Sequence, residues 1–177
     1  MKIALDDIKA TPKELAYTEG VDELNARLDR GIHDYRVPRG LDVRVEYYRA
    51  GLDVFFNGSL HGEVVGTCAR CLEEYAFGLD HPFVFVLEPR AAAPSESARL
   101  SAEDLALSYY EGEAIDLTPL VHEQAMLALP TRPLCSEDCR GLCSRCGANL
   151  NAGPCGCPAA APADPRLAAL HALSRAK

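Results

Sequence analysis

The stretch LDVRVEY, residues 41–47, is the strongest indicator of the fold, because apolar and charged residues alternate along it without a break. A period of two places these sets on opposite faces of a β-strand, one buried and one in water. A second apolar run, Leu52–Phe56, leads into Asn57-Gly58. This dipeptide favours a two-residue hairpin turn, since both positions tolerate positive φ. The sequence therefore predicts a β-hairpin centred on Asn57-Gly58.

Further strands extend this hairpin into a sheet. A return strand through Val64, Val65 and Thr67 and another over residues 75–87 would complete an antiparallel meander covering residues 41–88. Residues 3–8 are compatible with an edge strand. We therefore expect an α+β fold, with an antiparallel sheet of about five strands and a few short helices.

Helical signals lie on both sides of the meander. Val21–Leu28 has apolar residues at helical spacing. Thr118-Pro119 predicts a second helix, with Thr118 as N-cap and Pro119 at the first helical position, and Pro130 ends this helix.

The expected organisation has three parts. Residues 1–130 form an α+β body, and residues 131–157 form a cysteine-rich zinc-binding segment. Residues 158–177 form a linker and a short C-terminal helix that begins at Asp164-Pro165.

Charge is unevenly distributed along the 177 residues. The chain has 18 Lys and Arg against 26 Asp and Glu, a net charge of −8, which argues against a generic nucleic-acid binder. Residues 1–130 have a net charge of −11, including an acidic stretch over residues 96–123, whereas residues 131–177 have a net charge of +3. No apolar run approaches the ~18–20 residues of a membrane helix, and acidic residues interrupt the N-terminus where a signal peptide would be apolar. We therefore expect a cytoplasmic protein without a membrane partner.

Eight cysteines form the most specific pattern in the chain. In a reducing compartment disulfides are rare, so paired cysteines indicate metal binding. Four thiolates make a closed tetrahedral zinc site, and eight thiols permit two structural sites. The predicted metal ligands are the pairs Cys68 and Cys71, Cys135 and Cys139, Cys143 and Cys146, and Cys155 and Cys157.

Spacing alone leaves the grouping of these pairs open. We favour a local site from Cys143, Cys146, Cys155 and Cys157 together with a long-range site from the other four, because a short loop closes at lower entropic cost. A zinc ribbon would instead join the two Cys-x-Arg-Cys units, residues 68–71 and 143–146. Four cysteines also ligate an iron–sulfur cluster. Thiols that bind no metal are a further possibility, above all at residues 68 and 71.

Catalytic signals are weak. A cysteine nucleophile needs a neighbouring histidine base, and none of the five histidines lies in the cysteine segment. Arginines beside the cysteine pairs would neutralise thiolate charge or contact phosphate. The candidate RNA-binding residues among them are Arg132, Arg140 and Arg145.

The cysteine string in residues 134–151, together with residues 68–73 and the expected helix over residues 115–130, resembles the bacterial YceD family, also described as domain of unknown function 177. The resemblance covers residues 15–175. It implies a role in accumulation or processing of large-subunit ribosomal RNA, and it supplies no active site.

These observations together predict a non-enzymatic ribosome-biogenesis factor that supports accumulation or processing of large-subunit (23S) rRNA and is stabilised by one or two structural Zn²⁺ ions. The expected partners are large-subunit rRNA or a precursor particle and a basic ribosomal protein. A metal-dependent RNA-processing enzyme would need an open coordination position. A thiol redox sensor would instead need accessible, unmetallated cysteines.

Overall fold

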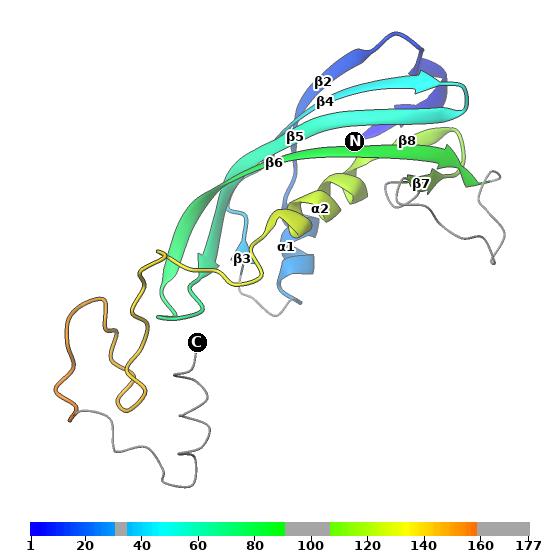
Figure 1. Cartoon of the computed structure of the whole chain (residues 1–177). Helices are drawn as coiled ribbons and strands as arrows, with labels where there is room; N and C mark the ends of the chain where they lie inside the picture. The colour runs from blue at the N-terminus through cyan, green and yellow to red at the C-terminus, as the bar shows by residue number, and fades with distance from the viewer. Residues whose placement is uncertain (31–34, 91–106, 159–177) are drawn as a thin grey trace, which may run out of the picture.

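A long, curved β-sheet dominates the computed structural model, which describes residues 1–30, 35–90 and 107–158 (Figure 1). Its strand order is β2-β4-β5-β6-β7, with β3 also paired to β5. Neighbouring strands are antiparallel except β6 and β7, which are parallel. The strands are β2 (Lys13–Glu19), β3 (Tyr35–Arg36), β4 (Leu41–Ala50), β5 (Asp53–Thr67), β6 (Glu74–Pro89) and β7 (Leu107–Tyr110).

Shorter elements cover one face of this sheet, and Figure 1 shows both α-helices on the same side of it. They comprise the two-stranded sheet of β1 (Lys2–Ala4) and β8 (Ala114–Asp116), the 3₁₀-helix η1 (Leu5–Asp7), α1 (Asp22–Leu28) and α2 (Leu117–Ala128). Among the described residues, no helix is long and apolar enough to cross a bilayer.

Alternating side chains of the central strands form the core. In β4, Leu41, Val43, Val45 and Tyr47 are buried, and the charged residues between them are exposed, as the alternation predicts. The largest fully buried side chain is Phe56 of β5, whose ring stacks on Phe85 of β6. The α+β fold with an antiparallel core is therefore confirmed.

The hairpin predicted at Asn57-Gly58 is wrong. These residues lie in the middle of β5, paired with β4 on one side and β6 on the other. The turn comes earlier, at Gly51, which has a φ of 66°. Gly58 instead allows neighbouring strands and the Phe83 ring to pack closely. A Cβ at this position would lie 2.5 Å from the Arg44 carbonyl oxygen and 2.7 Å from the Phe83 ring.

The N-terminal half of the sheet also differs from the prediction. Residues 3–8 do not form one edge strand, because β1 ends at Ala4 and η1 follows. The sequence pattern did not predict β2. The main sheet has six strands, close to the expected five, and β1 and β8 form a separate two-stranded sheet.

The helix start in residues 116–118 differs as well. The N-cap of α2 is Asp116, whose side chain accepts a hydrogen bond from the Thr118 N–H at 3.1 Å, so Thr118 is already helical. The helix expected to begin at Asp164-Pro165 lies outside the described residues.

Candidate metal centre

Four cysteines from two distant segments meet at the turn between β5 and β6. This first cysteine cluster consists of Cys68, Cys71, Cys135 and Cys139. The Sγ atoms of Cys68 and Cys139 are 3.7 Å apart, as are those of Cys71 and Cys135. All but Cys135 are buried, and Tyr75 and Leu134 pack against the buried three. The cluster therefore fastens the chain that follows α2 to the end of the sheet.

Hydrogen bonds hold these two segments together around the sulfurs. The Ala69 N–H donates to the Pro133 carbonyl at 2.8 Å, and the Leu142 N–H donates to the Arg70 carbonyl at 3.1 Å. The Arg70 guanidinium donates to the carbonyls of Glu137 and Cys139, at 3.0 and 2.8 Å. Arg70 is thus used in holding the tail in place.

The second cysteine cluster is local to the tail. It consists of Cys143, Cys146, Cys155 and Cys157, whose sulfurs, like those of the first cluster, all lie within 4.8 Å of one another. Cys143 and Cys155 Sγ are 3.3 Å apart. No member is fully buried. The structure thus brings the eight sulfurs together in the two sets that the loop-closure argument favours, and each set can hold a metal ion.

Two tight turns, here called knuckles, carry one pair in each cluster: knuckle 1 is residues 68–72 and knuckle 2 is residues 143–147. In each, the last N–H donates to the first carbonyl at 2.9 Å. In each, the N–H of the central arginine lies 3.5 Å from the first sulfur. The last residue has a positive φ in both, 61° at Leu72 and 71° at Gly147. The knuckles are therefore equivalent in backbone, but only knuckle 2 ends in glycine.

Within each cluster, the neighbouring groups lower the pKa of some thiols and raise the pKa of others. Burial raises the pKa of Cys68, but backbone N–H groups facing its sulfur lower it to about 6. The backbone N–H of Cys146 likewise lowers the pKa of Cys143 to about 6, whereas the Cys146 thiol raises the pKa of Cys157 to about 12. Four neighbouring thiolates repel one another, and a bound cation would remove that repulsion.

Asn151 is a site residue that the cysteine spacing did not reveal. Its Nδ2 donates to the Cys139 sulfur at 3.2 Å and lowers the pKa of that thiol. Its Oδ1 accepts a hydrogen bond from the Arg140 N–H at 2.7 Å. Asn151 lies in the loop of the second cluster but contacts a cysteine of the first, so it links the two clusters. Its only sequence signal is its place at the end of the string CGANLN, residues 146–151, directly after a predicted ligand pair.

The three candidate RNA-binding arginines lie on the surface of the tail. Arg132, Arg140 and Arg145 are exposed. Within residues 1–30, 35–90 and 107–158, no ion pair or side-chain hydrogen bond joins their guanidinium groups to another residue. Exposed Glu137 and Asp138 lie between them in the sequence. Their charge is therefore available to a partner.

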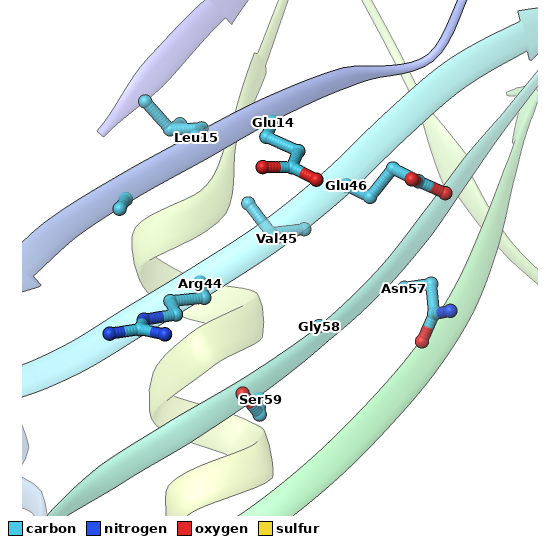
Figure 2. A pocket seen from close by; sticks show the side chains of 9 residues that line it. Glu14, Leu15, Arg44, Val45, Glu46, Asn57, Gly58 and Ser59 are labelled. Atoms are coloured by element: carbon cyan, nitrogen blue, oxygen red, sulfur yellow. The ribbon is translucent and has the colours of Figure 1, made fainter.

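Two other hollows in the described part of the chain contain no cysteine. A depression of about 770 Å³ on the open face of the sheet is lined by Glu14, Arg44, Glu46, Asn57 and neighbouring residues (Figure 2). It contains no histidine or cysteine. The second hollow is lined by Glu19, His122 and neighbouring residues, and His122 is buried there with 3.6 Å between its Nε2 and Glu19 Oε1.

Comparison with known proteins identifies the family. A family model described as "Large ribosomal RNA subunit accumulation protein YceD" matches residues 56–174, about two thirds of the chain. The chain therefore belongs to the YceD family, which confirms the resemblance seen in the cysteine string. The match includes both cysteine clusters.

Mycobacterial proteins are among its relatives. Uncharacterized protein ML1660 of Mycobacterium leprae is 30% identical over 128 residues, which cover 72% of this chain and 56% of that protein. Uncharacterized protein Rv2926c of Mycobacterium tuberculosis is 32% identical over 114 residues, or 64% of this chain and 52% of that protein. The chain thus spans about half the length of the curated relatives it matches. No solved structure matches.

Proposed function

We propose that this chain is a non-enzymatic ribosome-biogenesis factor of the cytoplasm that supports accumulation or processing of 23S rRNA, stabilised by structural zinc. The description of its family supports the link to the large ribosomal subunit. The proposal that it acts by binding, and not by catalysis, rests on one observation: all eight thiols are grouped in two sets of four. Such a protein acts by binding, through a surface that the metals hold in shape.

The sulfur geometry suits single zinc ions. Zinc in a tetrahedral four-thiolate site has Zn–S bonds of about 2.3 Å, which places neighbouring sulfurs about 3.8 Å apart. Three separations, 3.7, 3.7 and 3.3 Å, are close to this value. An iron–sulfur cluster contains several metal atoms and needs its ligands further apart than the 4.8 Å limit seen here.

The closed ligand sets argue against metal-based catalysis. A catalytic zinc site keeps one position for water or substrate and uses three protein ligands. Here each set supplies four cysteine sulfurs. A redox sensor is also disfavoured for the first cluster, because three of its four thiols are buried.

The tail offers the surface best suited to RNA. Three exposed guanidinium groups, at residues 132, 140 and 145, project from a segment held by two metal sites. Arginine binds phosphate through a planar fork of donors, and a rigid scaffold lowers the entropic cost of that contact. The body of the chain is acidic and would repel RNA, so we propose that it faces a basic ribosomal protein.

Gradient sedimentation tests this proposal. Tagged wild-type protein should co-migrate with large-subunit precursor particles, and changing Arg132, Arg140 and Arg145 together to Glu should reduce that fraction at least fivefold. Native mass spectrometry should show two zinc ions per chain in both proteins, because none of the three arginines is a ligand. A matched control changes the exposed arginines Arg27, Arg36 and Arg39 of the body to Glu. Absence of wild-type protein from the particle fractions would refute the ribosomal proposal.

Retention of the triple variant on particles would instead refute the role of the tail arginines. Metal content separates zinc-stabilised binding from redox sensing. A chain with less than about 0.2 zinc per molecule and eight titratable thiols would favour a thiol sensor.

A further inference from the structure

We infer that Leu72, at the end of knuckle 1, is a contact residue for a protein partner, and that it inserts into an apolar pocket bordered by basic side chains. This goes beyond the proposed function, which assigns no role to the Leu72 side chain. The inference depends on that proposal only for the particle used in one arm of its test.

The backbone at Leu72 is one that leucine disfavours. Its φ is 61°, and it is the only non-glycine residue with positive φ in the described part of the chain. A Cβ in this region lies close to backbone atoms, which is why glycine is preferred there. Knuckle 2 shows the preferred solution, because Gly147 occupies the equivalent position with the same 2.9 Å hydrogen bond.

Burial of the Leu72 side chain does not compensate for this unfavourable backbone conformation. Its side chain is 65% exposed, and it is absent from the side chains that pack around the buried cysteines. A leucine that is both strained and exposed contributes less to folding than glycine would. The side chain is therefore explained by a contact outside this chain.

The surroundings of Leu72 indicate which kind of partner fits. Glu73 and Glu74 follow it and are exposed, which disfavours an RNA backbone. The neighbouring guanidinium, Arg70, is engaged by the carbonyls of Glu137 and Cys139 and is not free for phosphate. An apolar side chain beside two carboxylates is complementary to an apolar pocket with lysine or arginine at its rim.

The knuckle also holds this side chain rigidly. The Leu72 N–H donates to the Cys68 carbonyl, and the Cys68 N–H donates to the Glu73 carbonyl, both at 2.9 Å. Cys68 and Cys71 beneath it are buried. Rigid presentation of an apolar anchor lowers the entropic cost of binding.

The first arm of the test uses large-subunit precursor particles as the probe. Leu72→Gly should bind them at least fivefold more weakly than wild type, while it retains two zinc ions and releases them to a chelator no faster. The matched control is Leu127→Ala, since Leu127 is 68% exposed on α2 in ordinary helical backbone. If wild type binds the particles, equal binding by Leu72→Gly would overturn the inference. Faster zinc loss from Leu72→Gly would also overturn it, because the side chain would then be structural.

The second arm does not need the particle. Benzoylphenylalanine is placed at residue 72, or at residue 127 as control, and cells are irradiated. We expect one protein adduct, specific to residue 72 and identified by mass spectrometry, whose formation Glu73→Lys with Glu74→Lys suppresses. An adduct only with RNA, or none, would overturn the inference. Wild-type protein that ignores particles but forms the residue-72 protein adduct would refute the proposed function and leave this inference standing.

Discussion

Replacing a cysteine of either cluster should unfold different parts of the tail, because the clusters are anchored differently. Cys139→Ser removes a buried thiol of the first cluster, and Cys146→Ser removes an exposed thiol of the second. We expect Cys139→Ser to release the tail from the sheet. Cys146→Ser should open only the loop of residues 143–157.

The magnitude follows from the contacts that join the tail to knuckle 1. Four hydrogen bonds cross between them, through Ala69, Leu142 and the two Arg70 contacts, and together contribute about 4 kcal/mol. Ordering residues 135–157 costs on the order of 1 kcal/mol per residue, so these bonds cannot hold the tail alone. A structural zinc ion contributes an apparent ~10–16 kcal/mol of folding free energy in small peptides. Loss of zinc from one cluster would therefore be roughly enough to unfold the part of the tail that this cluster holds.

Amide hydrogen exchange reports each cluster separately. In Cys139→Ser, protection of the Ala69 and Leu142 amides should fall at least about a thousandfold, which corresponds to roughly 4 kcal/mol. In Cys146→Ser, the Cys143 and Gly147 amides should lose protection while Ala69 keeps it. Amides of β4 should stay protected in both variants. The reasoning would be refuted if Ala69 remained protected in Cys139→Ser, or if both variants exposed the same amides.

Two further predictions concern the sheet. Gly58→Ala should destabilise the protein by about 2–3 kcal/mol in urea unfolding, because the new Cβ would clash with the Arg44 carbonyl oxygen. Gly78→Ala is the control and should be neutral or stabilising, because no atom lies within 4 Å of the Cβ position there. Similar effects of the two substitutions would contradict the packing role of Gly58. The Tyr35 hydroxyl donates to the Pro130 carbonyl at 2.5 Å, and burial raises its pKa to about 12. Because the pKa of Tyr35 is higher in the folded than in the unfolded protein, the stability that its hydroxyl contributes is complete below pH 10 and is lost as the pH rises to 12. Tyr35→Phe should therefore lower the free energy of unfolding by about 1 kcal/mol at pH 8 and by less at pH 11. An equal loss of stability at both pH values would contradict this prediction.

The sequence predicted the features that local spacing controls. The alternation in residues 41–47 indicated β4 and its buried face, and loop lengths predicted how the cysteine pairs group. Asn57-Gly58 misled because the same dipeptide suits a turn and a crowded strand. Only the pairing of β5 with strands on both sides decides between them. Asn151 escaped notice for a similar reason, because its contact with Cys139 depends on how the second loop folds back.

The two clusters also differ in what must fold before they can form. The sequence separation between Cys71 and Cys135 is 64, and that between Cys143 and Cys155 is 12. Loop-closure entropy makes the longer connection about 1.5 kcal/mol costlier in the unfolded chain, or roughly tenfold in affinity. The four thiols of the second cluster can therefore come together before the sheet exists. The first forms efficiently only once β5, β6 and α2 have brought its ends together, so the position of the tail arginines depends on a folded sheet.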